Sequence, residues 1–261
     1  MDALFALPVP VSAGLFILGV VALSLASYAL ARAALSRHAV EETRDLAGSV
    51  LFRMAALHGL VLALVFAQEL GAIRDVDLAA AEEAALLGDV YYDLRRYGGE
   101  EAEAIQGHLA RYGRIVLEEE WGGLAAEGRL SLEAWHAWEA AYEGLLALGP
   151  ADARQDRLLD VMLGDVRALS ELREARENAA RGGTSGLFLV AAISGVALIS
   201  AAYFTWPPTA LNLALIAAFA GYTGLVVYFV VAFANPYRPP GAADPVGFER
   251  FLTPEVRAAA G

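Results

Sequence analysis

The feature that most limits how this chain can fold is a pair of long stretches without a charged side chain. One runs from Val11 to Ala31 and the other from Gly182 to Tyr237. An uncharged apolar stretch of about 18 residues or more is typical of a helix that crosses a membrane. The segment between them, residues 70–186, holds 23 acidic residues and 12 arginines. The sequence therefore predicts an integral membrane protein with one acidic domain outside the membrane.

Four membrane-spanning helices account for the apolar sequence. The last apolar block is too long for one span, and Trp206-Pro207-Pro208 divides it, as suits a turn at the membrane surface. The expected spans cover residues 11–31, 47–69, 186–205 and 209–233. Four spans place both chain termini on the same side of the membrane as the acidic insert.

The acidic insert is predicted to be helical throughout. No proline interrupts residues 69–96, so the second span should continue out of the membrane as one long helix that ends at Gly98-Gly99. Three more helices are expected, over residues 100–121, 132–148 and 152–180. Gly122-Gly123 should end the first of them, and Ser131 is a suitable N-cap for the second. A loop-rich tail then carries a short helix near residues 254–260.

The predicted fold class is therefore all-α, a polytopic membrane protein with a helical extramembrane domain inserted between spans two and three. Its expected parts are residues 1–69 (two spans), 70–186 (acidic helical domain), 187–234 (two spans) and 235–261 (C-terminal tail). The first span follows no basic residue and is longer than the apolar core of a signal peptide, so we expect it to remain in the mature protein.

Composition and motifs argue against most chemical functions. The chain has no cysteine, which excludes disulfides and thiolate metal sites, and its acidic balance argues against binding nucleic acid. No nucleotide-binding or hydrolase motif is present, so we expect no catalytic residue, no metal and no cofactor. His136-x-x-Glu139 and Asp75-x-Asp77 are interpreted as surface pairs. Glu118-Glu119-Glu120 is interpreted as a solvated helix end, although its position near a C-terminus makes an arginine or cation partner more favourable.

One face of the second span is the best candidate for a functional surface. At about 100° per residue, its members share one direction on the helix, and Glu83 follows further along. These residues are Met54, His58, Val61, Val65, Gln68, Glu69 and Glu83. Ionisable groups inside a membrane usually face water or a protein partner. The face could line a pore, with an apolar middle and polar ends, or it could be a packing seam with Arg53 reaching to the interface.

The chain resembles the bestrophin-like family of bacterial and plant membrane proteins, and four groups of residues carry the resemblance. They are His38 with Glu42-Thr43-Arg44-Asp45 and the Leu- and Ala-rich Ala55–Ala67; Glu83-Ala84 with Tyr91-Tyr92; Tyr112 with Glu120-Trp121; and Asn235-Pro236-Tyr237-Arg238 with Phe248. Together they cover most of the chain in the expected order. The chain departs from the family at Tyr237-Arg238-Pro239, where Phe and a Gly are usual, which affects only the expected conformation of the tail.

The resemblance implies an architecture related to bestrophin channels. Those are ring-shaped oligomers, usually pentamers, in which the second span lines a narrow apolar neck and the helical insert forms a cytoplasmic vestibule. Carried over, it places His58, Val61, Val65 and Glu69 on the axis and the insert and both termini in the cytoplasm of a bacterium, beneath its inner membrane. The calcium clasp of animal bestrophins has no recognisable counterpart, so calcium gating is not expected.

Three functions follow as hypotheses. The first is a homo-oligomeric ion channel that leans toward cations, because acidic walls concentrate cations; its partners are lipid, ions and further copies of the chain. The second is a non-conducting scaffold or sensor that binds a protein partner through Trp121, Trp135, Trp138 and Tyr142. A membrane enzyme is the least favoured, because no nucleophile–base set or three-ligand set is present.

Overall fold

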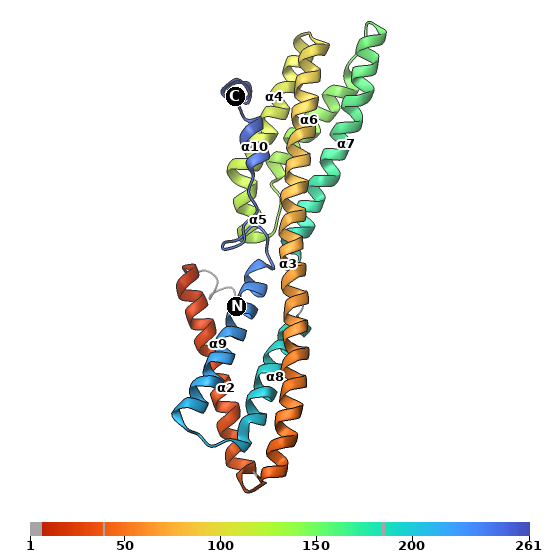
Figure 1. The fold of residues 1–261 in the computed structure, drawn as a ribbon. Helices are drawn as coiled ribbons and strands as arrows, with labels where there is room; N and C mark the ends of the chain where they lie inside the picture. The colour runs from red at the N-terminus through yellow and green to blue at the C-terminus, as the bar shows by residue number, and fades with distance from the viewer. Residues whose placement is uncertain (1–6, 39, 184–185) are drawn as a thin grey trace. The chain divides into compact units, whose positions relative to one another are not determined.

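The computed structural model describes residues 7–38, 40–183 and 186–261, and every regular element within these ranges is a helix. The longer helices are α2 (Val9–Leu35), α3 (Glu41–Tyr97), α4 (Glu100–Ile115), α6 (Leu132–Ala147), α7 (Ala153–Arg181), α8 (Gly186–Ala202) and α9 (Ala210–Phe233). The short ones are η1 (Ser36–His38), η2 (Val116–Glu120), α5 (Trp121–Glu127), η3 (Tyr203–Thr205), α10 (Val246–Phe251) and α11 (Pro254–Ala259). The predicted all-α class is confirmed (Figure 1).

The described chain forms two compact units. Unit 1 comprises Met1–Gly71 and Gly183–Ala234, and unit 2 comprises Ala72–Gly182 and Asn235–Gly261. The C-terminal segment thus clusters with the helices of unit 2. The helix α3 contributes residues to both units as one uninterrupted element, and it ends where Gly98 and Gly99 adopt φ values of 78° and 101°. Those left-handed angles favour glycine, which is why the Gly98-Gly99 stop signal predicted the end of this helix.

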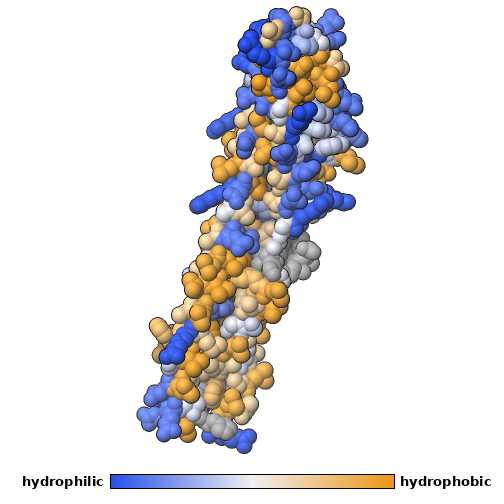
Figure 2. Space-filling view, turned by 90° about the vertical axis from the view of Figure 1, so that its right-hand side faces the viewer, coloured by the Kyte–Doolittle hydropathy of each residue, from blue (hydrophilic) through white to orange (hydrophobic). Residues whose placement is uncertain are grey.

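Unit 1 contains apolar helices that can cross a membrane. Four stretches of the described chain are long and apolar enough, namely Val9–Leu35, Glu41–Tyr97, a third that contains α8 and η3, and Ala210–Phe233. The apolar part of the third lies after Arg181, where the sequence carries no charge. Figure 2 shows apolar side chains over most of the visible surface of this unit. The four predicted spans therefore lie in helices that are long and apolar enough to cross a membrane.

Small hydroxyl groups join the spans of unit 1 to one another. The Ser24 and Ser200 hydroxyls are 2.6 Å apart between α2 and α8, and the Ser12 hydroxyl lies 2.8 Å from that of Tyr228 on α9. Both pairs are buried, and polar groups within a membrane need such partners. At the α8–α9 turn, Arg32 donates to the carbonyl of Trp206 at 2.9 Å. The basic side chain thereby caps the end of the α8–η3 segment.

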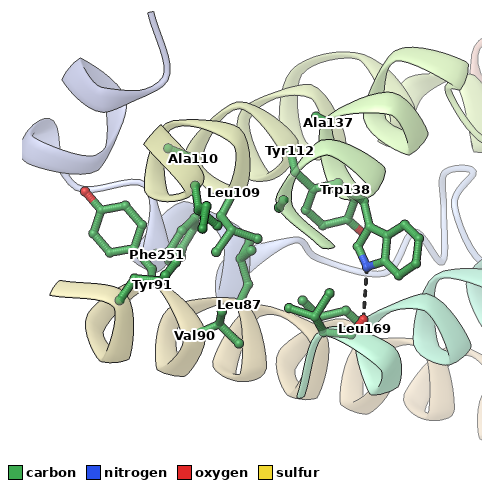
Figure 3. Packing of buried hydrophobic residues seen from close by; sticks show 14 of the residues in the cluster. Leu87, Val90, Tyr91, Leu109, Ala110, Tyr112, Ala137, Trp138, Leu169 and Phe251 are labelled. Carbon is green, nitrogen blue, oxygen red and sulfur yellow. Dashed lines mark hydrogen bonds between the residues drawn. The ribbon is translucent and has the colours of Figure 1, made fainter. Parts of the chain in front are cut away.

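Unit 2 has a conventional hydrophobic core made by α3, α4, α6, α7 and the C-terminal helices. Leu87, Leu109 and Leu169 are fully buried, and the indole N–H of Trp138 donates to the carbonyl of Val166 at 3.0 Å (Figure 3). Phe251 of α10 meets Tyr91 edge to face, with ring centroids 5.8 Å apart. Figure 3 shows this side chain reaching the core from the C-terminal segment.

Two expectations about the insert and the tail are wrong in detail. Gly122-Gly123 does not end the helix that begins at residue 100, because the chain stays helical through η2 and α5 and stops at Gly128, whose φ is 65°. The glycines lie inside a helix that burial of Leu124 stabilises. The tail contains α10 as well as α11, so it is more ordered than its loop-rich composition indicates.

Candidate functional site

Most of the predicted face of α3 packs inside its own unit. Met54, His58, Val65 and Glu69 are all half-buried, whereas Val61 and Gln68 are exposed. The imidazole of His58 lies directly against Gly195 of α8, at a position where any β-carbon would collide with the ring. The packing of these four side chains matches the seam interpretation.

A neighbouring face of α3, which adjoins the predicted face at Gln68, is exposed. Leu57, Leu60 and Leu64 have exposed fractions of 65%, 57% and 63%. At about 100° per residue they lie within a sector of about 80° that also contains Arg53 and, at its edge, Gln68. We call these five residues the open face of α3. It consists of three leucines with an arginine at one end and an amide at the other.

Glu83 does not lie on an open surface. Its side chain has no exposed area, and Arg176 of α7 binds both carboxylate oxygens, at 2.6 Å and 3.1 Å. The hydroxyl of Tyr112 on α4 also donates to this carboxylate. Glu83 is therefore removed from the candidate pore-lining residues, because its carboxylate is buried and already bound by Arg176 and Tyr112.

Glu83 belongs to a buried charge cluster, which we define as Glu83, Glu120, Arg173 and Arg176 together with Tyr112. Arg176 also donates to Glu120 at 2.7 Å, and Arg173 donates to the other oxygen of Glu120 at 2.9 Å. The four charged side chains are at most 5% exposed. Two carboxylates face two guanidinium groups, so the formal charges balance, which is the condition for tolerating them in a protein interior.

A π-helical turn delivers Glu120 to the cluster. Residues Val116–Glu120 form η2, and the wider turn directs Glu120 inward while Glu118 remains at the surface, where it pairs with Arg257 at 2.9 Å. Single π-helical turns are frequent at functional positions. The interpretation of Glu118-Glu119-Glu120 as wholly solvated is therefore wrong for Glu120, and the arginine-partner alternative is confirmed for Glu118 and Glu120.

The cluster also shifts the pKa values of Tyr112 and Arg176. Burial, reinforced by the Glu83 carboxylate, raises the pKa of the Tyr112 hydroxyl well above its usual range. Burial alone would lower the pKa of Arg176, but the carboxylates of Glu83 and Glu120 outweigh it and raise that pKa well above the ordinary value. Tyr112 is thus a neutral hydrogen-bond donor and Arg176 a permanent cation.

Several residues that carry the family resemblance meet at this cluster, whereas those in α3 before Gly71 lie in unit 1. Trp121 and Phe248 stack beside the Arg176 guanidinium, with ring centroids 5.9 Å and 5.8 Å from its carbon. The hydroxyl of Tyr237 donates to the Arg176 carbonyl at 3.3 Å. Arg173 and Arg176 were not predicted from the sequence, because arginines among charged neighbours on a helix are typical of a solvated face. Their spacing of three residues, on the side of Leu169, was the available signal.

The aromatic residues proposed for partner binding are engaged within unit 2. Trp135 stacks on Trp138 at 4.7 Å, and Trp138 stacks on Tyr142 at 5.4 Å. Arg173 covers Trp135 at 5.5 Å, and the indole N–H of Trp121 donates to a tail carbonyl at 3.3 Å. Their faces are therefore largely taken by α6, α7 and the tail.

Within the described ranges, no group of three or more His, Asp or Glu side chains is placed to hold a metal ion. His136 lines a surface groove of about 360 Å³ with His108, Arg111 and Glu133. Asp77 accepts the backbone N–H of Asp244 at 3.0 Å. Each of these motif residues has a structural setting of its own, and neither motif assembles a ligand set.

Comparison with known proteins identifies the family. The model of the Bestrophin-like domain matches residues 18–242, and no curated protein sequence matches the chain. Two crystallised variants of a bacterial bestrophin homologue from Klebsiella pneumoniae superimpose with TM-scores of 0.65 and 0.62, at 12% and 11% identity. They cover 94% and 95% of this chain, and 99% and 98% of their own.

A further structure of that homologue has a TM-score of 0.61 at 13% identity, over 94% of this chain and 98% of the other. At such low identity the likeness shows a shared fold. The family model spans most of the sequence. The chain therefore belongs to the Bestrophin-like family.

Proposed function

We propose that this protein is an ion channel formed by a ring of identical copies, five by analogy with the bestrophin channels that it resembles. The observation that carries the proposal is the open face of α3. Most of the predicted face is half-buried, whereas the leucines of the open face are exposed and are therefore available to meet a central axis.

The proposed neck consists of Leu57, Leu60 and Leu64 from each copy. Val61, with an exposed fraction of 45%, and Gln68 stay in the pore-lining set from the predicted face. The half-buried residues of the predicted face would instead pack within unit 1 and so fix the orientation of α3. They are Met54, His58, Val65 and Glu69. An apolar constriction of this type gates by excluding water, and it opens when small side chains widen it.

We further propose that the channel leans toward cations. Unit 2 carries nearly all of the net charge of −12, and walls of one sign concentrate counter-ions. The support is restricted to surface carboxylates such as Glu82 and Asp89, since Glu83 and Glu120 are neutralised internally. We place the protein in a bacterial inner membrane with unit 2 and both termini in the cytoplasm, on the strength of four spans and the family resemblance.

Ion flux into liposomes tests the channel. Liposomes that contain wild-type protein should lose an ion gradient faster than empty liposomes. Leu60→Ala or Leu64→Ala should increase the ion flux, because the smaller side chain widens the neck. Leu215→Ala on the exposed side of α9 is the matched control, with a side chain 61% exposed, and should leave flux unchanged. No flux from wild type and from either widened variant would favour the non-conducting scaffold.

A further inference from the structure

The open face of α3 carries one charged side chain, Arg53. No other charged residue occurs from Leu46 to Gln68. Arg53 is exposed, and among the described residues it has no hydrogen bond or ion pair. Arg32 and Arg44 in the same unit differ, because both donate to carbonyls at the end of the α8–η3 segment.

The depth of Arg53 makes contact with lipid costly. It lies seven residues after Leu46, which is about 10 Å along the helix axis. An ionised side chain at such a position faces a water-filled path or a partner far more often than hydrocarbon. Leu57, Leu60 and Leu64 follow on the same side, so Arg53 stands at one end of the proposed apolar neck.

The direction of the side chain is set by the helix. Helical side chains point toward the N-terminus of the helix, which for α3 is the end beside η1. Repeated around an axis, the guanidinium groups would form a ring at the neck mouth on that side. Rings of arginine favour anions and repel cations.

We propose that Arg53 is a specificity-determining residue, a positive ring that limits how strongly the channel favours cations. The inference rests on the proposed function. The acidic surface of unit 2 and the Arg53 ring act in opposite senses, so wild-type selectivity is the balance of the two. Removing the ring leaves the acidic surface unopposed.

The test is the reversal potential of reconstituted channels in a potassium chloride gradient. Arg53→Gln should raise the permeability to potassium relative to chloride by about tenfold, because charges that line a narrow cleft change the local ion concentration by about tenfold or more. Arg53→Lys, which keeps the charge, should behave like wild type. Arg37→Gln is the matched control, an exposed arginine in η1 outside the spans. Equal ratios for Arg53→Gln and Arg37→Gln would overturn the inference and indicate an arginine that reaches to lipid headgroups.

A second measurement does not depend on how the glutamine variant folds. The chain has no cysteine, so Arg53→Cys offers a single thiol. A positively charged thiol reagent should move the permeability ratio back toward the wild-type value, whereas a neutral reagent should not. Identical effects of both reagents would overturn the inference. If wild-type protein carries no current at all, the proposed function fails first, which distinguishes the two failures.

Discussion

Replacing Arg176 with methionine should strongly destabilise unit 2. The guanidinium donates three charge-assisted hydrogen bonds, to Glu83 at 2.6 Å and 3.1 Å and to Glu120 at 2.7 Å. Arg176→Met keeps most of the side-chain volume but leaves two carboxylates facing one remaining arginine, Arg173. Glu83 then has no cationic partner in a site with no solvent exposure.

The magnitude follows from the cost of an unpaired buried charge. Removing one partner of a buried ion pair costs about 3–5 kcal/mol. For a domain of this size each kcal/mol lowers the melting temperature by about 2–4 °C, so we expect a fall of about 10 °C. Thermal unfolding followed by tryptophan fluorescence in detergent measures it, since Trp121 lies 5.9 Å from Arg176. Arg181→Met on the same helix, with an exposed i,i+4 pair to Glu177, should cost less than about 0.5 kcal/mol.

A second substitution distinguishes charge from shape. Arg176→Met combined with Glu83→Gln restores the charge balance, because Glu120 remains paired with Arg173 at 2.9 Å. The double variant should recover at least about 2 kcal/mol of the loss. A loss below about 1 kcal/mol for the single variant, or purely additive losses for the pair, would refute the reasoning about the cluster.

Two further predictions concern packing and pH. A β-carbon on Gly113 would lie 2.9 Å from the Phe251 ring, so Gly113→Ala should lower the free energy of unfolding by about 1–3 kcal/mol. Gly164 of α7 has open space around it, so Gly164→Ala should raise that free energy by about 0.5–1 kcal/mol. Chemical unfolding of the two variants measures both changes. Partial burial, with the charges of Asp89 and Asp93, raises the pKa of Asp165, so its contribution to stability is present below the ordinary carboxyl pKa and is lost as pH rises. Asp165→Asn should therefore raise the melting temperature at pH 7 but not near pH 3.

Local signals were sufficient for much of the fold. Charge-free length predicted the first, third and fourth spans, and left-handed glycines explain why Gly98-Gly99 ended α3. Ser131 accepts the N–H of Ala134 at 3.3 Å, as its predicted N-cap role requires. The helix end predicted at Gly122-Gly123 is wrong, because a glycine pair ends a helix only where packing does not stabilise the next turn. Here the burial of Leu124 stabilises that turn.

The site was harder, because it depends on contacts distant in the sequence. Periodicity gives the members of a helix face but not which face packs, so it grouped His58 with Val61 although the first meets Gly195 and the second is exposed. The one local signal for Arg176 is its place on the side of α7 that carries Leu169, and this does not identify its partners. Its partner Glu83 is 93 residues away, and only the folded bundle brings them together.

The most direct test of the channel proposal is chemical modification of single cysteines on α3 in conducting channels. Leu64→Cys, on the open face, should lose most of its current when a bulky charged thiol reagent is added. Leu215→Cys, on the exposed side of α9, should keep its current. Unchanged current at Leu64→Cys, with the thiol shown to have reacted, would contradict the placement of the open face of α3 on the ion path.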